Sequence, residues 1–155
     1  MSGINSKRST RARQRARSLG MSMIEVLIAI LILVFGILGI AAMQATTLRN
    51  SQSAMEHSQA VVQTYAILDR MRANVPVARI GGYDLVNMTC ALPDAGGLAA
   101  NERREWIQTL KDNLGPAACG QINCNAFTCT VRVRWDDSRG TGGSNAQELV
   151  TRTML

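Results

Sequence analysis

The hydrophobic pattern of the chain is dominated by one long apolar run near the N-terminus. The 18 residues from Val26 to Met43 include no charged side chain, and as a helix they would span roughly 27 Å, about one hydrocarbon core of a bilayer. Residues 1–20 carry six Lys or Arg and no Asp or Glu. The positive-inside rule therefore predicts a cytoplasmic N-terminus, with everything after Met43 on the other side. A plain N-terminal anchor or a general secretory signal sequence is the alternative interpretation.

The helical pattern continues beyond the apolar run. Residues 44–74 contain neither Gly nor Pro and are rich in helix formers, so we expect one helix from about Ser22 to Asn74 with an amphipathic second half. Pro76 ends this helix, because the residue before a proline avoids helical backbone angles. Two series mark the amphipathic pattern of this second half, which is expected to pack on the globular part. Leu48, Met55 and Val62 recur at spacings of seven, and the residues at spacings of three and four are Val61, Tyr65, Leu68 and Arg72.

The next part of the chain is expected to contain one further helix. Residues 77–100 read as mostly loop. A helix then runs from Asn101, which is a suitable N-cap, to Leu114, and Gly115 and Pro116 end it.

Strand signals follow this helix. Residues 127–135 alternate between apolar and polar side chains, which predicts a strand. Residues 147–154 are expected to return as its antiparallel partner, after a polar, glycine-containing turn at 136–145. The fold class predicted is therefore α+β, with one long N-terminal helix packed on a small antiparallel sheet. The inward face of the first strand is expected to comprise Phe127, Cys129, Val131, Val133 and Trp135.

Four cysteines follow the apolar run, at Cys90, Cys119, Cys124 and Cys129. Thiols on the exported side of a bacterial membrane oxidise, and a small domain with 4% aromatic residues gains most from disulfides. Four cysteines allow three pairings. We favour Cys90–Cys119 with Cys124–Cys129, the second pair being a local loop closure. A zinc site of four thiolates is the alternative, although the two close pairs typical of such sites are missing.

The charge of the chain is concentrated in its first 20 residues. The whole chain has 17 Lys and Arg against 11 Asp and Glu, and six of the 17 lie in residues 1–20. A chain that began at Met21 would have 17 − 6 = 11 cations against 11 anions, and a net charge of zero. The basic pI of the whole chain is therefore no argument for nucleic-acid binding.

The sequence contains no catalytic constellation. It has no phosphate loop, no nucleophile motif and no metal-binding helix, so we expect no cofactor, no metal and no enzymatic activity. His57, the only histidine, is expected to be a solvated helix residue. Asp136 and Asp137 lie in a polar turn, where aspartate is favoured by local hydrogen bonding, and a calcium site is the alternative.

The beginning of the helix carries a resemblance to a known family. The segment Leu19–Leu33, in which Gly20 ends the basic stretch and the lone carboxylate of Glu25 precedes the apolar run, resembles the N-terminal signal of type IV pilins. The continuation Gly36–Gln44 is similar to the PilV group of minor pilins. The close similarity covers about residues 17–50.

The resemblance implies a role for three residues. Gly20 would precede the cut made by a prepilin peptidase, and Met21 would become the new N-terminus and be N-methylated by the same enzyme. Glu25 would pair with an N-terminal amine during filament assembly, which avoids an unpaired charge in an apolar bundle. The chain departs from most major pilins because the mature protein would begin with Met rather than Phe. The helix also lacks the usual proline, which leaves Gly36 and Gly39 as either packing points or tolerated glycines.

The resemblance also implies a division into parts and a location. Residues 1–20 would be the cleaved leader, residues 21–43 the transmembrane and assembly half of the helix, residues 44–75 its amphipathic half, and residues 76–155 a periplasmic head. The protein would lie in the bacterial inner membrane and then in the pilus. Its partners would be other minor pilins, the major pilin, the prepilin peptidase and the inner-membrane assembly platform. It would prime pilus assembly in a complex at the filament tip and so support twitching motility and adhesion.

Two other functions stay open. A pseudopilin of a type II secretion system shares the same signal and helix. A DNA-uptake or ligand-binding pilin head belongs to another class, and it would use one basic face formed by Arg132, Arg134, Arg139 and Arg152. The balanced charge of residues 21–155 weighs against strong binding of nucleic acid.

Overall fold

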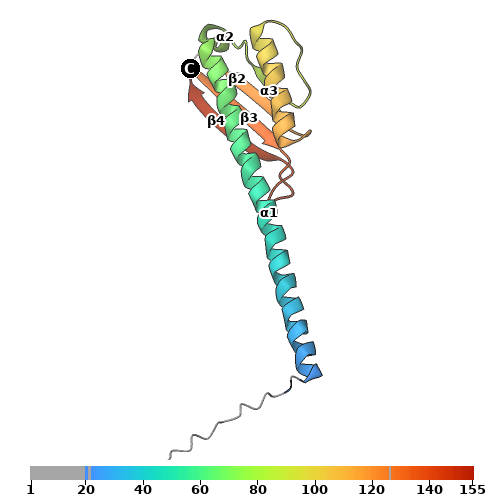
Figure 1. The fold of residues 1–155 in the computed structure, drawn as a ribbon. Helices are drawn as coiled ribbons and strands as arrows, with labels where there is room; N and C mark the ends of the chain where they lie inside the picture. Colours follow the sequence, from blue (N-terminus) through green and yellow to red (C-terminus); the bar gives the residue numbers. More distant parts are fainter. Residues whose placement is uncertain (1–19, 21, 126) are drawn as a thin grey trace, which may run out of the picture. The chain divides into compact units, whose positions relative to one another are not determined.

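The computed structural model describes residues 20, 22–125 and 127–155. Two compact units divide between Ile40 and Ala41, and helix α1, Met23–Ala73, contributes to both. Its bounds confirm the single long helix expected from the sequence to within one residue at each end. Figure 1 shows the fold, with labels on all of its helices and strands except the first strand.

The helix ends where expected, but the chain then begins a second helix instead of a loop. Asn74 leaves the helical region (φ −134°, ψ 49°), and Pro76 lies in the first turn of α2, Val75–Arg79. A proline is well tolerated there because the first N–H groups of a helix have no partner within the helix. Pro76 thus both separates the two helices and starts the second.

The buried side of α1 differs from the one predicted. Its buried residues are Ala60, Thr64, Ile67, Leu68 and Met71, so only Leu68 of the predicted set is correct. Leu48, Met55, Val62 and Tyr65 are all more than half exposed, and Val61 is 40% exposed. Residues 60–71 are apolar on more than one side of the helix, and the side with the small Ala60 and Thr64 is the one that lies against the core. The Thr64 hydroxyl donates a hydrogen bond to Ala60 O at 2.8 Å, so its burial leaves no unsatisfied donor.

Residues 77–100, expected to be mostly loop, contain the strand β1, Leu85–Thr89, in addition to most of α2. The second strand, β2, Cys119–Cys124, was also not predicted. Only Leu85 of β1 is buried, and the alternation of β2 is interrupted by Gly120. Neither strand therefore carries the regular alternation from which a strand can be recognised in a sequence.

Helix α3, Leu98–Leu114, begins three residues earlier than expected. Asn101 is therefore not its N-cap, a position held by Gly97; the Asn101 side-chain oxygen instead accepts a hydrogen bond from Gly96 N at 3.0 Å. The C-terminal end confirms the prediction, since Gly115 has φ 98°, a backbone angle that favours glycine. The helix buries Trp106, Ile107, Leu110 and Leu114.

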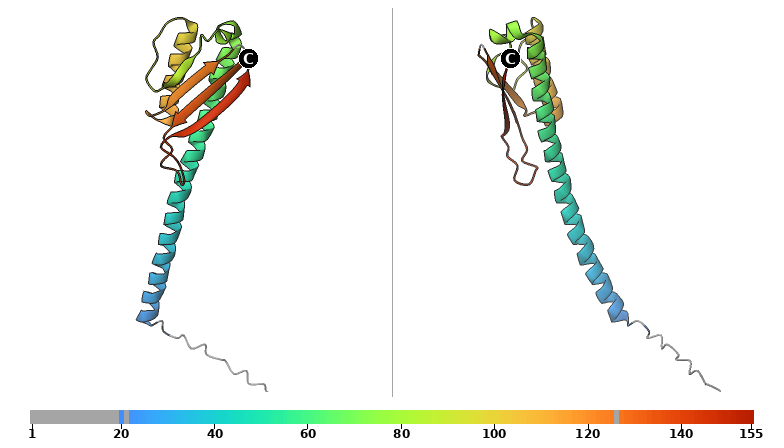
Figure 2. Two further views of the ribbon diagram at one scale, coloured as in Figure 1. Left: turned by 180° about the vertical axis from the view of Figure 1, so that it is seen from behind. Right: turned by 90° about the vertical axis from the view of Figure 1, so that its left-hand side faces the viewer.

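The four strands form one antiparallel sheet in the order β1-β2-β3-β4. The strand β3, Thr128–Trp135, pairs with β4, Gln147–Met154, over the full length of both, as predicted. Figure 2 shows the sheet on one side, with α3 and the C-terminal part of α1 on the other. Four of the five predicted inward residues of β3 are buried, but Phe127 precedes the strand and is 68% exposed.

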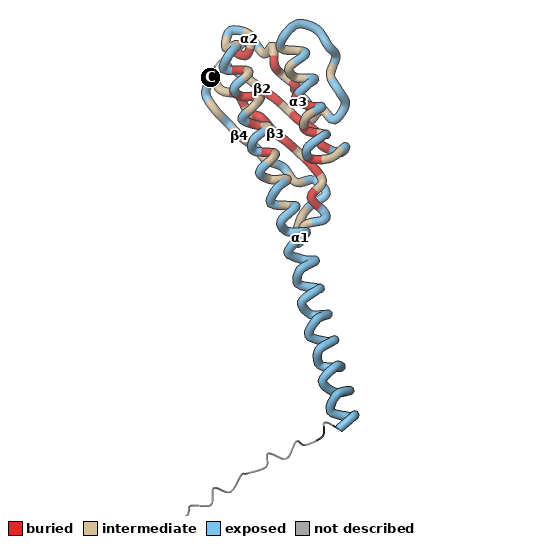
Figure 3. The backbone as a smooth tube through the Cα atoms, in the orientation of Figure 1, coloured by how far each residue is buried: buried red, intermediate tan, exposed pale blue. Residues whose placement is uncertain are grey.

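The core lies between the sheet and the two helices, where Figure 3 shows the buried positions. Trp106 of α3 donates its indole N–H to Gln63 O at 3.0 Å, which ties α3 to α1. Gly120 of β2 lies directly beneath the same ring. A Cβ at this position would overlap Trp106, so the close approach of α3 to the sheet requires glycine here.

Both disulfides match the favoured pairing. Cys90, which follows β1, is bonded to Cys119 at the start of β2. Cys124 is bonded to Cys129, its register partner across the β2–β3 hairpin. No cysteine is free, and the four-thiolate zinc site is therefore excluded because none of the four can supply a thiolate.

Candidate functional site

The candidate functional site is the first turn of α1 with the apolar segment that follows it. Ser22 O accepts hydrogen bonds from Glu25 N at 3.0 Å and from Val26 N at 3.3 Å, so the helix begins within a few residues of the exposed Gly20. Glu25 lies in the first turn, where the positive end of the helix dipole stabilises a carboxylate. The predictions for Met21, as the new N-terminus and methylation site, lie outside the described residues.

The apolar segment has no partner within the described chain. Every described residue from Gly20 to Gln52 is exposed, including the bulky side chains of Leu27, Leu31 and Phe35. By length and composition α1 is able to cross a membrane, and a signal sequence near the N-terminus has the same properties. A continuous apolar surface of this kind is covered by lipid or by other apolar helices when the protein is in its working environment.

Two glycines interrupt the apolar segment without any reason within the described chain. A Cβ at Gly36 or Gly39 would meet nothing within 4 Å. Glycine in a helix interior costs about 0.5–1 kcal/mol relative to alanine, and small residues let two helices approach closely within a membrane. No contact within the described residues therefore requires glycine at either position.

A second feature lies where the β3–β4 connection meets α1. The side chain of Asp137 is only 5% exposed and accepts a hydrogen bond from the Ser53 hydroxyl at 2.7 Å. His57 Nε2 lies 3.5 Å from the same carboxylate, and its ring packs edge-on against Trp135 at 4.9 Å between centroids. His57 is thus only partly exposed and held by two contacts, which corrects the expectation that it is simply solvated. We call the contact of residues 136–146 with α1 the loop clasp.

The loop clasp also contains a pair of opposite charges. Arg139 lies 3.7 Å from Glu56 of α1. Burial raises the pKa of Glu56, Arg139 opposes that rise, and the negative charges of Asp137 and Asp136 add to it. Within residues 20, 22–125 and 127–155 no group of three or more metal-ligating side chains lies together. The hydrogen bond from Ser53 and the contact with His57 hold the Asp137 carboxylate against α1.

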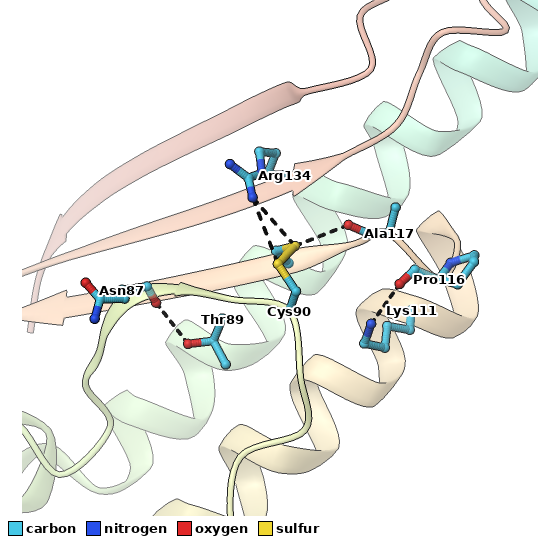
Figure 4. The surroundings of a disulfide bond; sticks show 8 residues. Asn87, Thr89, Cys90, Lys111, Pro116, Ala117 and Arg134 are labelled. Carbon is cyan, nitrogen blue, oxygen red and sulfur yellow. Dashed lines mark hydrogen bonds between the residues drawn. A yellow bond between two sulfur atoms is a disulfide. The ribbon is translucent and has the colours of Figure 1, made fainter.

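The expected basic face forms only in part. Side chains alternate along a strand, so the even-numbered residues of β3 and β4 share the sheet face opposite the core. Arg132, Arg134 and Arg152 are on this outer face, whereas Arg139 belongs to the loop clasp. Arg132 pairs with Glu148 at 3.2 Å. Arg134 directs its guanidinium towards the Cys90–Cys119 disulfide, 3.9 Å from each sulfur (Figure 4).

The outer face also carries a shallow cavity of about 220 Å³. Its lining is polar and consists of Gln121, Asn123, Thr130 and Arg132. These residues come from β2 and β3 and offer amide and guanidinium donors, which is the chemistry that binds an anion.

Neither a protein-family model, nor a curated protein, nor a solved structure matches this chain. The described geometry therefore supports an α+β protein with one long N-terminal helix, two disulfides and an exposed apolar segment. Any narrower functional assignment depends on the residues themselves.

Proposed function

We propose that this protein is a minor subunit of a type IV pilus, cleaved after Gly20 and assembled through the N-terminal half of α1. The observation that carries the proposal is the exposed apolar segment Val26–Met43, which directly follows one carboxylate, Glu25, in the first turn of α1, a few residues after an exposed Gly20. A plain membrane anchor does not require a carboxylate at this position, whereas packing of the helices in a filament gives it a partner.

Glu25 has a specific task in this proposal. In the membrane the carboxylate remains near the interface, at the positive end of the helix dipole. In a filament of packed helices it would face an apolar environment, and the N-terminal amine of another subunit would compensate its charge. Gly36 and Gly39 would permit close approach of that neighbouring helix, which explains two glycines that the chain's own fold does not require.

Residues 76–155 would form most of the periplasmic head in this proposal. Two disulfides suit an oxidising compartment. The subunit would belong to a complex of minor pilins at the filament tip and would support pilus assembly, twitching motility and adhesion. A type II secretion pseudopilin is the nearest alternative, since it would use the same segment in the same way.

Intact mass is the test of the processing step. The protein is isolated without reductant from membranes of cells with and without the prepilin peptidase. We expect loss of residues 1–20 and gain of one methyl group only in the presence of the peptidase, together with the mass deficit of two disulfides. A full-length mass in both strains would refute the proposal and leave a plain membrane anchor.

The role of Glu25 is tested separately. Glu25→Ala is compared with Ser22→Ala, a change in the same exposed stretch that removes no charge. We expect Glu25→Ala to reduce co-purification with other pilins and surface piliation by tenfold or more, and Ser22→Ala to leave both unchanged. Equal effects of the two changes would show that the carboxylate has no assembly role.

A second candidate function, anion binding by the head, is favoured by the outer face of the sheet. Two of its three arginines, Arg134 and Arg152, have no carboxylate within ion-pair distance among the described residues. The test is binding of the purified protein to duplex DNA at increasing salt. Binding that weakens steeply with salt and is lost in an Arg134→Gln, Arg152→Gln variant would support this function, and equal binding by the variant would exclude it.

A further inference from the structure

The two disulfides lie in different surroundings. Cys129 is fully buried in the core, and the sulfur of its partner Cys124 lies 4.0 Å from Met71 Sδ. Cys90, by contrast, is exposed, whereas its partner Cys119 is only 2% exposed. Exposed disulfides are the ones that exchange with other thiols, and cysteines enclosed by a core are inert. Exposure therefore distinguishes Cys90–Cys119 as the disulfide that an external thiol can reach.

A cation lies beside this disulfide. Arg134 Nη2 is 3.9 Å from Cys90 Sγ and 3.9 Å from Cys119 Sγ, as the dashed lines of Figure 4 show. Thiol–disulfide exchange begins with the attack of an anionic thiolate and releases a second thiolate. A guanidinium at both sulfurs stabilises the charge that arrives and the charge that departs. Arg134 is thus placed to accelerate exchange at this disulfide.

The charge of Arg134 is available for this role. Glu148 is opposite Arg134 in the β3–β4 register, but its carboxylate pairs with Arg132 at 3.2 Å. Among the described residues Arg134 itself belongs to no ion pair. In the same part of the chain no Arg or Lys forms a hydrogen bond to the sulfurs of Cys124–Cys129. The two disulfides therefore differ in neighbouring charge as well as in exposure.

We propose that Cys90–Cys119 is an exchange-active disulfide, at which the thiolate of an external dithiol attacks Cys90 and displaces Cys119 beside Arg134. The exposed Cys90 is the sulfur that the reagent reaches, and the buried Cys119 is the leaving group. Ala117 O lies 3.2 Å from Cys119 Sγ, so the buried thiol has a hydrogen-bond acceptor once it is protonated. This inference does not rest on a role in a pilus.

The reaction consists of two displacements. In the first, a bond forms between the dithiol's sulfur and Cys90 Sγ, the Cys90–Cys119 bond breaks, and its electron pair stays on Cys119 as a thiolate. In the second, the other thiolate of the dithiol attacks the dithiol's own sulfur in this mixed disulfide and releases Cys90. The dithiol is thereby oxidised to a disulfide. Two electrons and two protons pass to the two cysteines.

Opening of the disulfide would release the end of β1. Cys90 directly follows β1, a strand of five residues with an irregular register against β2. The next hydrogen bond along the chain is at Pro93 O, which accepts from Arg104 at 2.8 Å. Reduction therefore frees residues 90–92 from β2, whereas Cys124–Cys129 keeps the β2–β3 hairpin closed. The exchange site thus controls one edge of the sheet without opening the core.

The experiment is reduction of the purified full chain in detergent by dithiothreitol. Each sample is quenched with acid and alkylated in denaturant, and the mass of the peptides gives the reduced fraction of each disulfide. We expect Cys90–Cys119 to open at least about tenfold faster than Cys124–Cys129. Equal rates for the two disulfides would overturn the proposal, because the difference in exposure and charge would then have no effect.

Arg134→Gln tests the cation, and Arg132→Gln is the matched control because it removes the same charge from the same face of β3. Arg134→Gln should slow the opening of Cys90–Cys119 about fivefold or more, and Arg132→Gln less than about twofold. Neither should change the rate for Cys124–Cys129, which reports any loosening of the fold within the same molecule. Equal effects of the two substitutions on Cys90–Cys119 would overturn the role of Arg134.

A second measurement on the unaltered chain keeps the test decisive where Arg134→Gln disturbs the fold. Glutathione has a single thiol, so it can be trapped by acid as a mixed disulfide with the sulfur that it attacks. We expect the glutathione adduct on Cys90 and the alkylated thiol on Cys119. An adduct on Cys119, or equal amounts on both cysteines, would overturn the proposal.

Discussion

Residues 22–52 and residues 53–155 use their apolar side chains in opposite ways. In the first region every described side chain is exposed, although most of them from Met23 to Met43 are large and apolar. In the second region Ile67, Leu68 and Trp135 are almost fully buried within one core. The contrast shows that hydrophobicity in the first region does not serve the chain's own fold. It is available for lipid or for other helices, whereas in the second region it stabilises a domain.

The strongest test of this contrast is a pair of identical truncations. Leu68 is fully buried and Leu31 is 57% exposed. Leu68→Ala should lower the free energy of unfolding by about 2–5 kcal/mol, because it removes buried methyl groups and leaves a cavity. Leu31→Ala should change it by less than about 0.5 kcal/mol.

The measurement is denaturant unfolding of the full chain in detergent, followed by tryptophan fluorescence. Both tryptophans, Trp106 and Trp135, are buried in the core, so the signal reports the second region alone. A comparable loss of stability from both truncations would contradict the contrast, since it would mean that residues 22–52 contribute to the same cooperative unit.

The disulfides sharpen the contrast, because both lie in the second region and enclose loops of different length. Cys90–Cys119 has a sequence separation of 29 and Cys124–Cys129 of 5. Removing the longer loop closure, with Cys90→Ala and Cys119→Ala, should lower the free energy of unfolding by about 3.5 kcal/mol, from the entropy of loop closure. Removing the shorter one, with Cys124→Ala and Cys129→Ala, should lower it by about 2 kcal/mol. The same unfolding assay without reductant gives both values. The reverse order would show that native-state effects, rather than the entropy of the unfolded chain, dominate.

The sequence predicted well the features that are repeated or local. The bounds of α1 follow from 51 residues without a proline, and the end of α3 follows from Gly115. Cys124 and Cys129 are five residues apart in a hairpin, so their pairing is a local closure. The exposed apolar segment and Glu25 at its start were also evident from composition and position alone.

The features that the sequence did not reveal depend on contacts between distant residues. The buried side of α1 is chosen by the sheet and α3, because several sides of residues 60–71 are apolar enough to be buried. β1 and β2 were missed because pairing, rather than alternation, defines them. The loop clasp joins Ser53 and Asp137 across 84 residues, and no sequence motif indicates such a pair.

Gly36 tests whether the first region contacts another helix. Gly36→Ala should favour the helix by about 0.5–1 kcal/mol, since a Cβ meets nothing in the chain itself. If Gly36 is a packing point, co-purification with the pilins proposed as its partners should nevertheless decrease, and decrease further with Gly36→Leu. Unfolding of the second region should not change in either variant. Full co-purification with Gly36→Leu would identify Gly36 as a tolerated glycine.

The smallest expected effect concerns pH, and it distinguishes two glutamates of the second region. Burial raises the pKa of Glu56 above its ordinary value, with Arg139 opposing and Asp137 and Asp136 adding to the rise. Between the ordinary and the raised pKa the folded state binds more protons than the unfolded state, so the free energy of unfolding falls as pH rises through this window. Glu56→Gln should remove this slope.

Glu105 provides the comparison of opposite sign. Two hydrogen bonds from Arg70, at 2.9 and 3.1 Å, lower the pKa of Glu105. The unfolded state therefore binds more protons below the ordinary pKa, and the free energy of unfolding rises with pH there. The measurement is the free energy of unfolding from pH 3 to 7, followed by tryptophan fluorescence. Glu105→Gln should reduce its dependence on pH below the ordinary pKa of glutamate, and Glu56→Gln should reduce it above that pKa. Identical profiles for the two variants would mean that neither the burial of Glu56 in the loop clasp nor its distance from Arg139 controls its proton affinity.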